Sequence, residues 1–488
     1  MICLGENSIL MNLAMILEMA ASADDRVAVT VGERSLTASG LLRHAQAAAH
    51  RFRTYPAVLH LGANGLAYPV GLFGAALAGV PFVPLNYRLG RDQLSGLIER
   101  HPGALVLRDP GDLDGLLDLP DPPAGEEITE MPDGDEIAVL LYTSGTTSAP
   151  KAAVLRHRHL LAYVLNTLEF ASAEEEDAAL VAVPPYHVAG LANLLTNLYT
   201  GRRVVYMPNF EPGEWLEIVR RERVTHALVV PTMLARIVAE VPGDDAGTPS
   251  LRSLAYGGSR TPRPVLERAL RVFPGVGFVN AYGLTETASS VAVLEPDDHR
   301  KALASDDTAV RARLESVGRA LPGVEFQVRD DDGTPLPVGE TGLVFVRGEQ
   351  ISGEYGGRSA LDEEGWFPTR DRGRLDADDY LFIEGRADDT IIRGGENIAP
   401  AEIEDVLLTH PDITEAVVVG PPDPEWGQRI VAVVVGSGDP AEVRRWVRDR
   451  LRSSKTPDAI VFRGELPKTD TGKILRRTLL ADLESANA

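Results

Sequence analysis

Short apolar runs rich in β-branched residues alternate along the chain with stretches of helical periodicity, such as the one at residues 66–78. The strand pattern recurs at residues 57–61, 82–85, 137–142, 227–230, 254–256 and 277–280. Strands that alternate with helices form parallel sheets covered by helices, and ligands then bind at the carboxyl ends of the strands. The pattern therefore predicts an α/β fold.

The composition changes near Gly385. Glycine- and aspartate-rich turns are predicted upstream, at residues 330–333 and 371–379. The downstream part predicts a small domain of about a hundred residues. Its predicted strands are 416–419, 430–435 and 459–462, and its predicted helix is 440–452. Because 488 residues exceed one hydrophobic core, we predict a large N-terminal domain of parallel or mixed sheets (1–385), a hinge (386–389) and a small, mobile C-terminal α+β domain (390–488).

The chain is strongly acidic, with 48 Lys and Arg residues against 71 Asp and Glu residues and a formal net charge of −23. Such a surface repels nucleic acid and anionic lipid, so neither partner is expected, and an anionic nucleotide needs local donors. Cys3 is the one cysteine, which excludes an intramolecular disulfide and a thiolate zinc cluster and fits a cytoplasmic protein. No basic segment typical of a secretory signal opens the chain. The apolar run at residues 70–80 is too short to span a bilayer.

The sequence YTSGTTSAPK at residues 142–151 is the strongest chemical signal. An apolar strand leads into hydroxyl side chains and a glycine, and a lysine closes the loop. Hydroxyls and exposed backbone N–H groups at a strand end cradle phosphate oxygens, and Lys151 adds a positive charge. The loop is not a Walker A motif, because no second glycine directly precedes the lysine. By itself, the decapeptide is equally typical of a surface turn.

This loop resembles the phosphate loop of the adenylate-forming superfamily, which contains acyl- and aryl-CoA synthetases, peptide-synthetase adenylation domains and luciferases. Further segments similar to the family's motifs follow in the family's order: PYH at 185–187, YGGS at 256–259, NAYGLTE at 280–286, GWF at 365–367 leading to Asp371, GRADD at 385–389, GGENI at 394–398 and PKTDTGK at 467–473. The similarity extends from residue 36 to residue 477 and is closest to the acyl- and aryl-CoA ligase branch.

The resemblance implies an enzyme that uses ATP and Mg²⁺ to convert a small carboxylic acid into an acyl-AMP and then passes the acyl group to the thiol of CoA. The nucleotide contacts that it implies are Thr143, Ser144, Gly145, Thr146, Thr147, Lys151, Gly258, Ser259, Asn280, Ala281, Tyr282, Gly283, Thr285, Asp371, Ile383, Arg386 and Lys473. The other sites that it implies are an acid pocket at His187, Gly257 and Ala281, a thiol channel at Gly394, Gly395 and Glu396, and a hinge at Asp388.

The resemblance places Lys473, Thr285 and Glu286 at the reacting atoms, with Glu286 as the metal ligand. Thr285 offers a hydroxyl to the α-phosphate, and Glu286 offers the hard oxygen that Mg²⁺ prefers. Without the surrounding segment, these two residues would indicate only a helix N-terminus. A substrate carboxylate must approach a phosphorus surrounded by negative oxygens, and the family's lysine at the position of Lys473 bridges the two.

Four further roles rest on side-chain chemistry together with the resemblance. Tyr282 follows a predicted strand, where its ring can stack on adenine, and Gly283 allows close backbone approach. Asp371 can accept hydrogen bonds from both ribose hydroxyls, and Arg386 can donate to ribose or phosphate.

His187 has two interpretations. It is either a core residue with its hydrogen bonds satisfied or a residue at the mouth of the acid pocket.

The chain departs from the family's pattern at two positions. Ser148 occupies a usual glycine position of the phosphate loop, and a left-handed backbone there would be strained. Arg370 stands between Thr369 and Asp371 where the family usually has glycine. Its side chain either points to solvent or adds a cation near the phosphates. Both departures leave the affinity for ATP and the identity of the acid open.

Three functions remain open at this point. The first is an acid–CoA ligase, because the glycine pair at 394–395 resembles the family's channel for the pantetheine arm. The second is a stand-alone adenylating enzyme whose acceptor is a carrier-protein thiol or a nitrogen nucleophile that attacks an activated nitrite. The third is an inactive nucleotide-binding homologue, against which the presence of Lys473, Glu286 and Asp371 argues. The sequence leaves the acid and the oligomeric state open, a homodimer included.

Overall fold

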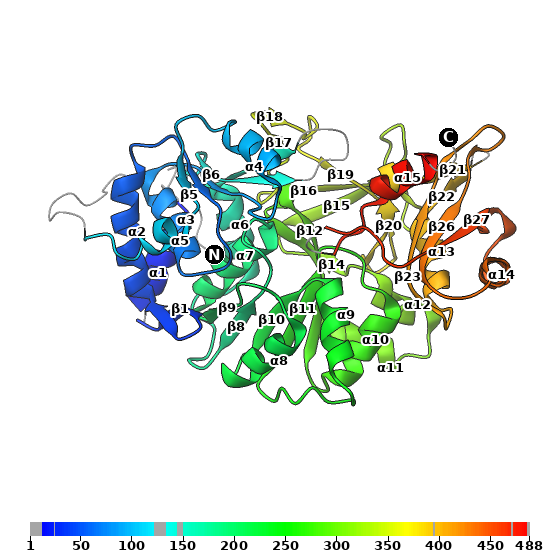
Figure 1. The fold of residues 1–488 in the computed structure, drawn as a ribbon, viewed down its shortest axis with the longest axis horizontal. Helices are drawn as coiled ribbons and strands as arrows, with labels where there is room; N and C mark the ends of the chain where they lie inside the picture. The colour runs from blue at the N-terminus through cyan, green and yellow to red at the C-terminus, as the bar shows by residue number, and fades with distance from the viewer. Residues whose placement is uncertain are drawn as a thin grey trace.

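The computed structural model describes residues 12–23, 25–121, 133–143, 150–393, 396–469 and 472–485. Figure 1 shows a large domain built from the N-terminal and middle parts of the chain, with a smaller C-terminal domain at one end of the long axis. The predicted phosphate-loop residues Ser144, Gly145, Thr146 and Thr147, together with Ser148, Gly394, Gly395 and Cys3, lie outside the described residues. None of the described helices is long and apolar enough to cross a membrane.

A nine-stranded sheet forms the centre of the large domain. Its strands lie in the order β14 (Arg319–Ala320), β13 (Ser289–Leu294), β12 (Gly277–Leu284), β11 (Ser253–Gly257), β10 (His226–Val229), β8 (Ala178–Val181), β9 (Arg203–Tyr206), β1 (Val27–Val31) and β2 (Arg34–Thr37). The strands from β12 through β11, β10, β8 and β9 to β1 pair with one another in parallel. Strand β8 is buried at every position, as expected of a parallel strand covered on both faces.

A seven-stranded sheet and a four-stranded sheet complete the large domain. The seven strands lie in the order β18 (Arg358–Ser359), β17 (Glu354–Tyr355), β7 (Lys151–Arg156), β6 (Ile137–Thr143), β4 (Phe82–Pro84), β3 (Val58–His60) and β5 (Leu105–Leu107). The four antiparallel strands lie in the order β15 (Val324–Arg329), β16 (Gly342–Gly348), β19 (Phe367–Leu375) and β20 (Leu381–Arg386). Because β17 pairs with β7, the two-residue strand at 354–355 lies beside the end of the predicted phosphate loop.

Helices fill the space between the two large sheets and cover the outer face of the nine-stranded one. One buried cluster joins both sheets to α1 (Ala14–Ala23), α2 (Ala38–Phe52), α3 (Ala67–Ala78), α6 (His157–Thr167) and α7 (Val188–Thr200). A second cluster packs the nine-stranded sheet against α8 (Pro212–Arg221), α9 (Pro231–Glu240) and α10 (Arg263–Val272). The remaining large-domain helices are α4 (Arg91–Ile98), α5 (Pro110–Asp114), α11 (Pro296–Ala304), α12 (Thr308–Ala312), η1 (Thr285–Thr287) and η2 (Arg313–Glu315).

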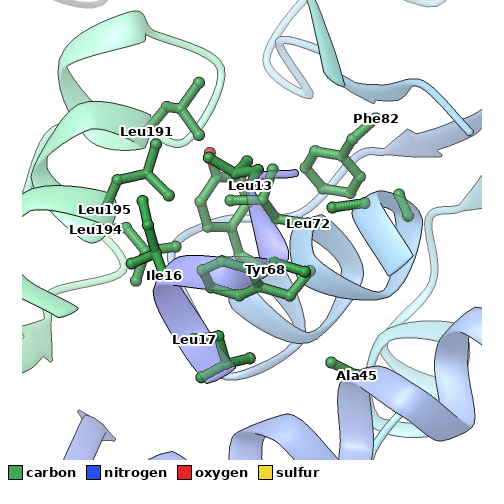
Figure 2. Close-up of a cluster of buried hydrophobic side chains, with 14 of the residues drawn as sticks. Leu13, Ile16, Leu17, Ala45, Tyr68, Leu72, Phe82, Leu191, Leu194 and Leu195 are labelled. Atoms are coloured by element: carbon green, nitrogen blue, oxygen red, sulfur yellow. The ribbon is translucent and has the colours of Figure 1, made fainter. Parts of the chain in front are cut away.

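Helix α7 is fixed by its leucines. Figure 2 shows Leu191, Leu194 and Leu195 of α7 beside Ile16 and Leu17 of α1. All five are buried, and the 3–4 residue spacing on α7 is that of one helix face. The helix begins directly after His187, so its packing sets the position of that residue.

The small domain has a three-stranded sheet covered on both faces and a separate four-stranded sheet. The three strands lie in the order β23 (Ile413–Val419), β26 (Val431–Gly436) and β27 (Ala459–Arg463), and the four in the order β22 (Glu396–Ile398), β21 (Ile391–Arg393), β25 (Gly427–Gln428) and β24 (Pro422–Asp423). Helices α13 (Pro400–Leu408) and α14 (Pro440–Arg448) pack on one face of the three strands, and α15 (Arg476–Ser485) packs on the other. The further helices are η3 (Ala387–Asp389), which follows β20, and η4 (Ser453–Lys455).

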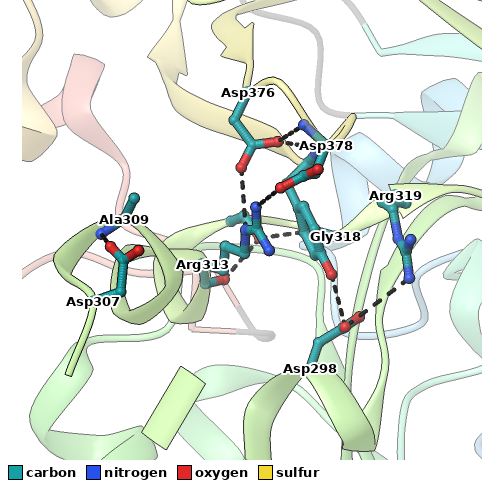
Figure 3. A network of polar contacts seen from close by, with 10 residues as sticks. Asp298, Asp307, Ala309, Arg313, Gly318, Arg319, Asp376 and Asp378 are labelled. Carbon is teal, nitrogen blue, oxygen red and sulfur yellow. Dashed lines mark hydrogen bonds and ion pairs between the residues drawn. The ribbon is translucent and has the colours of Figure 1, made fainter. Parts of the chain in front are cut away.

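A polar network ties the turn between β19 and β20 to the nine-stranded sheet. Figure 3 shows Arg313 of η2 between Asp376 and Asp378 of this turn, with Nε 3.2 Å from the Asp376 carboxylate. The hydroxyl of Tyr380 donates to Asp298 of α11 at 2.7 Å. These contacts hold the turn of the β19–β20 hairpin against η2 and α11.

Three predicted boundaries are wrong. Strand β12 continues to Leu284, because β13 pairs with its second half, so Tyr282 lies within a strand and does not follow one. Residues 371–375 belong to strand β19, and the turn begins only at Asp376. Helix α14 ends at Arg448 and not at residue 452, since Leu451 is the only apolar residue from 448 to 455.

Candidate active site

Three strands bring an aspartate, an arginine and a tyrosine together. Asp371 lies on β19, Arg386 ends β20 and Tyr282 lies on β12. The Tyr282 hydroxyl donates to Oδ2 of Asp371 at 2.5 Å, and Nε of Arg386 lies 3.1 Å from Oδ1. Asp371 is only 5% exposed. Because each carboxylate oxygen can accept more than one hydrogen bond, the predicted ribose contacts remain compatible with this geometry. We call these three residues the ribose corner.

A bulge in β19 aims Asp371 at this corner. Val344 of β16 lies opposite the three residues 369–371, because its neighbours pair with Pro368 and Arg372. The Thr369 hydroxyl donates to the Val344 carbonyl at 2.7 Å and accepts from the Asp371 N–H at 3.1 Å. Bulges of this kind redirect side chains and are common beside active sites.

Arg370 sits at the centre of the bulge in the left-handed region, with φ +62°. This backbone explains why a glycine suits the position, since left-handed φ costs other residues roughly 1–2 kcal/mol. Its side chain is exposed, and its charge opposes the rise that burial causes in the pKa of Tyr355. The cation therefore lies within electrostatic reach of the site, whereas the second departure, Ser148, falls outside the described residues.

Burial and the neighbouring groups shift the pKa of Asp371 in opposite directions. Burial raises the pKa of Asp371 above its ordinary value, and Glu286 adds to the rise. Arg386, Tyr282 and Lys473 act in the opposite direction by favouring the carboxylate. The acidic protein thus supplies local cations where the sequence predicts an anionic nucleotide.

The glycine turn after β11 lies against β12. Gly257 pairs with Ala281, and a Cβ at Gly257 would lie 2.1 Å from the Ala281 carbonyl oxygen. Gly258 follows with φ +87°, and Ser259 is exposed. The predicted acid-pocket residues Gly257 and Ala281 are therefore neighbours, at the carboxyl end of β11.

The other residues of the predicted nucleotide site mainly make contacts within the large domain. Asn280 donates to the Ser316 carbonyl at 3.1 Å. A Cβ at Gly283 would lie 1.9 Å from the Ser289 carbonyl oxygen, so the close approach at Gly283 is to β13. Ile383 lies on β20, two pairs from Asp371, and is partly buried. None of these geometries conflicts with contact to a nucleotide.

The phosphate side of the site lies where β6 and β7 separate. Thr143 pairs with Lys151, and its hydroxyl donates to the Lys151 carbonyl at 3.4 Å. Thr285 and Glu286 lie in η1, directly after β12. The hydroxyl of Tyr355 donates to Oε1 of Glu286, and the Lys151 ammonium lies 6.0 Å from the centre of the Tyr355 ring.

Glu286 fits the predicted magnesium site. Its side chain is 9% exposed, and the described part of the chain has no cluster of three or more His, Cys, Asp or Glu side chains. Mg²⁺ commonly binds one or two carboxylates and takes its other ligands from substrate phosphates and water. One carboxylate beside the phosphate loop therefore matches the chemistry of this ion.

Lys473 approaches the large domain on a tight turn. The Thr469 N–H donates to the Lys473 carbonyl at 2.8 Å, and the Lys473 N–H donates to the Thr469 hydroxyl at 3.0 Å. Gly472 has φ +78°, and a Cβ there would lie 2.2 Å from Oγ1 of Thr232 on α9. This turn, of which residues 468–469 and 472–474 are described, therefore contacts the large domain through Gly472; we call it the lysine turn.

The Lys473 side chain keeps an exposed surface, yet the large domain crowds its ammonium group. Desolvation lowers the pKa of Lys473 below its ordinary value, and Arg386 adds to the decrease. Asp389 and Asp371 act in the opposite direction. The predicted catalytic lysine thus lies within electrostatic reach of the ribose corner.

His187 lies in an aromatic cluster before α7. Its ring centre is 4.6 Å from that of Tyr186, which in turn packs edge-on against Tyr87 at 5.8 Å. The backbone N–H of His187 donates to the Pro184 carbonyl at 3.1 Å. The ring is partly buried, which keeps the predicted place at the mouth of a pocket open.

The predicted thiol channel lies on a different part of the small domain. Arg393 and Glu396 pair across the hairpin that contains the glycines, and Arg452 donates to Oε1 of Glu396 at 2.8 Å. Asp388 is exposed in η3. Gly472 of the lysine turn packs on Thr232 of the large domain.

Two family models match the chain. The model described as AMP-binding enzyme matches residues 17–355, and the model described as AMP-binding enzyme C-terminal domain matches residues 402–473. The first covers more than half of the chain. The chain belongs to the AMP-binding enzyme family.

Relatives in the AMP-binding enzyme family cover most of the chain. A feruloyl-CoA synthase of Amycolatopsis sp is 36% identical over 440 residues, which are 86% of this chain and 87% of the relative. A fatty acid–[acyl-carrier-protein] ligase of Streptomyces coeruleorubidus is 32% identical over 93% of this chain and 92% of the relative. The o-succinylbenzoate CoA synthetase of Bacillus subtilis, solved with its acyl-adenylate intermediate, has a TM-score of 0.81 and 28% identity over 96% of this chain and 97% of its own. The predicted α/β fold and the predicted branch, the AMP-forming acyl- and aryl-CoA ligases, are confirmed.

Sequence reasoning missed two sets of contacts in this AMP-binding enzyme. Tyr355 gives no motif signal, because an aromatic residue before a glycine pair indicates only a turn. The ion pair between Arg260 of the large domain and Asp405 of α13 also carries no local pattern. Both depend on segments that are distant in the sequence.

Proposed function

We propose that this enzyme activates a carboxylic acid with an aromatic ring as an acyl-AMP and transfers the acyl group to CoA. The aromatic ring is supported by two relatives, whose names specify ferulate and succinylbenzoate as acids. The observation that carries the proposal is the approach of Lys473 to the ribose corner, with Gly472 packed on Thr232 of the large domain. This approach is the arrangement that the proposed first half-reaction would require.

In the first half-reaction, a carboxylate oxygen of the acid attacks the α-phosphorus of ATP, and the bond to pyrophosphate breaks. Lys473 draws the two anions together and stabilises the charge that develops between them. Thr285 donates its hydroxyl to the α-phosphate. Lys473 does not need to transfer a proton, because the acid attacks as a carboxylate anion. No protein atom becomes bonded to the substrate.

The ribose corner binds and orients the nucleotide. Asp371 accepts from the ribose hydroxyls, Arg386 donates beside it, and Tyr282 holds the Asp371 carboxylate. Lys151 and the loop that precedes it bind the phosphates that leave as pyrophosphate. Glu286 would hold Mg²⁺ on this side of the site, and the ion would supply neutralisation of the charge on the leaving pyrophosphate.

In the second half-reaction, the CoA thiolate attacks the acyl carbon and AMP leaves. We propose that the small domain (390–488) turns on the hinge (386–389) relative to the large domain (1–385), so that Gly394, Gly395 and Glu396 replace the lysine turn at the site. The ion pairs on both sides of η3 support a pivot near Asp388. Arg386 is bonded to Asp371 of the large domain, whereas Asp389 lies 3.4 Å from Arg476 of α15.

The test is pyrophosphate release from MgATP with a panel of aromatic and aliphatic acids, followed by product mass analysis. We expect release with an aromatic acid and a CoA thioester as the final product. Release with no acid in the panel, together with no ATP–pyrophosphate exchange, would favour an inactive homologue. Release with aliphatic acids alone would contradict the proposal of an aromatic acid and leave the ligase assignment intact.

The second candidate function has a carrier-protein thiol as acceptor. The observation in its favour is the similarity to a fatty acid–[acyl-carrier-protein] ligase along almost the whole chain. Parallel reactions with CoA, with a phosphopantetheinylated carrier protein and with no thiol distinguish the two. Thioester formed only on the carrier protein would replace CoA in the proposal, and a product that needs neither thiol would point to a nitrogen nucleophile.

A further inference from the structure

One tyrosine contacts two groups that the proposed function assigns to the pyrophosphate side. The hydroxyl of Tyr355 donates to Oε1 of Glu286, and its ring faces the Lys151 ammonium at 6.0 Å. These groups come from η1, β17 and β7, which are far apart in the sequence. The phenol is therefore a bridge between the carboxylate and the lysine.

The segment that carries Tyr355 is held firmly against both neighbours. Glu354 forms a two-bond ion pair with Arg156 of β7, with distances of 3.0 and 2.9 Å. The backbone N–H groups of Ser352 and Gly353 both donate to the Glu286 carbonyl, at 2.9 and 3.2 Å. The backbone just before β17 and the Tyr355 side chain therefore both contact the same glutamate.

The geometry of the pair makes the phenol a donor. The hydroxyl donates one hydrogen bond to Oε1 of Glu286, which leaves the other carboxylate oxygen for a cation.

We propose that Tyr355 is a positioning residue that fixes the Glu286 carboxylate and the Lys151 ammonium in one arrangement for the metal-bound pyrophosphate group of ATP. The proposal rests on the proposed function, in which these two groups meet that part of the nucleotide. A carboxylate with one oxygen occupied is held for one-oxygen binding of a hard cation. Partners that orient a ligand in this way typically change metal affinity or activity by about 10–100-fold when removed.

A second tyrosine in the same protein offers a matched control. The Tyr380 hydroxyl donates to Oδ1 of the buried Asp298 at 2.7 Å, and the guanidinium groups of Arg313 and Arg319 lie over its ring at 4.3 and 5.0 Å. This phenol has the same kinds of partner but lies at the β19–β20 turn, away from the proposed pyrophosphate side. A purely structural effect of losing one hydroxyl should be similar at both positions.

The experiment compares Tyr355→Phe with Tyr380→Phe by calorimetric titration of MgATP and of AMP without any acid present. Tyr355→Phe is expected to weaken MgATP binding about tenfold and to leave AMP binding within about twofold. It should also raise the Mg²⁺ concentration for half-maximal pyrophosphate release by a similar factor. Tyr380→Phe is expected to lower the midpoint of thermal unfolding without either effect.

Two further variants separate the two contacts. In a Glu286→Gln background, Tyr355→Phe should add little, because the hydroxyl acts through the carboxylate. Tyr355→Leu also removes the ring, and it should weaken metal-free ATP binding by a further factor of roughly two to five through the loss of the Lys151 contact.

Three results would overturn the proposal: unchanged MgATP affinity in Tyr355→Phe, equal losses of MgATP and AMP affinity, or the same loss in Tyr380→Phe. Additive effects of Tyr355→Phe and Glu286→Gln would overturn the action through Glu286. If no acid supports pyrophosphate release, the proposed function fails, while the binding comparison still decides the role of Tyr355.

Discussion

Asp371 and Lys473 face the same site from different domains, and they are held in different ways. Asp371 lies buried in a bulge, with its carboxylate oxygens bonded to Tyr282 of β12 and to Arg386 at the end of β20. Lys473 lies on a turn of the small domain that meets α9 through the packing of Gly472 on Thr232. Under the proposed function, the nucleotide would meet a preformed corner, whereas the proposed reacting cation would depend on the packing of the small domain.

The contacts between the domains suit reversible docking. The ion pair of Arg260 with Asp405 is partly exposed on both sides. Exposed ion pairs typically contribute about 0–1 kcal/mol, and interfaces between domains resemble transient protein interfaces. The ribose corner has no such freedom, because moving Asp371 would break a sheet. This contrast can be tested by damaging each side separately.

The largest effect is expected from Lys473→Ala. Acyl-AMP formation should fall by ~10²–10³ or more, because one group that stabilises transition-state charge is removed. AMP binding and the unfolding midpoint should stay near those of the wild type, since the ribose corner is intact and the side chain packs little. Pyrophosphate release and calorimetric AMP titration measure the two sides of the comparison.

Lys468→Ala is the matched control for this variant. Lys468 lies on the same turn but pairs with Glu415 of the small domain at 2.5 Å. It should retain near-normal acyl-AMP formation. If both lysine variants lose activity equally, the loss reflects damage to the turn and not the chemistry of Lys473.

The second prediction concerns the hinge. Proline fixes φ near −65° and is tolerated in the first turn of a helix, so Asp388→Pro should fit the short helix η3 and hold the docked arrangement. Acyl-AMP formation should survive, while thioester formation from supplied acyl-AMP falls by about tenfold or more, because a hinge works through a few residues with large φ/ψ changes. Single-turnover assays of each half-reaction decide; equal losses in both would place the pivot elsewhere.

The third prediction is a pH effect on docking. Desolvation raises the pKa of Asp405 from 3.8 to about 6, with Glu315 and Glu404 adding to the rise and Arg260 opposing it. Because the pKa is raised, docking is accompanied by proton uptake, and it strengthens as the pH falls through about 6. Acyl-AMP formation relative to thioester formation should rise over this range by less than about tenfold, since the carboxylate is partly exposed. Asp405→Asn should abolish this component of the pH profile, and a profile identical to the wild type would exclude Asp405 as its source.

The smallest effect concerns the strain in the bulge. Arg370→Gly should raise the free energy of unfolding by about 0.5–1 kcal/mol, because left-handed φ costs arginine more than glycine loses in backbone entropy. Urea unfolding measures the gain. Asp379→Gly, at φ +63° in the following turn, is the control for strain alone. Only Arg370→Gly should also weaken ATP binding, by a few-fold at most for an exposed cation; equal ATP affinity in both variants would mean that Arg370 serves no phosphate.

The sequence predicted the buried parallel strands better than the rest of the fold. Strands β10 and β11 lie within one or two residues of the predicted runs at 227–230 and 254–256, because a strand covered on both faces needs a continuous apolar run. The four-stranded sheet of the large domain, with the order β15, β16, β19 and β20, was not predicted. Strand β19 has the sequence FPTRDRGRL, which lacks an apolar run and has three consecutive charged residues, and part of it was assigned to a turn.

The residues of the candidate site also fall into two groups, those that the sequence predicted and those that it missed. Asp371, Glu286 and Lys473 could be named because each lies in a motif with its own spacing. Tyr355 could not, because its hydrogen bond to Glu286 spans 69 residues and depends on a two-residue strand. Contacts made by tertiary packing leave no period in the sequence, and the hinge and its boundaries stay predictions.

The helix η3 has a consequence for protein engineering. Every residue of the ribose corner precedes it in the chain, and the lysine turn follows it. The ribose corner and the lysine turn are thus encoded in two consecutive stretches of gene, joined by a three-residue connector. A large domain grafted onto the small domain of a relative would keep its own preference for nucleotide and acid while exchanging the thiol it serves, so acceptor choice could be altered as a cassette without redesign of the pocket.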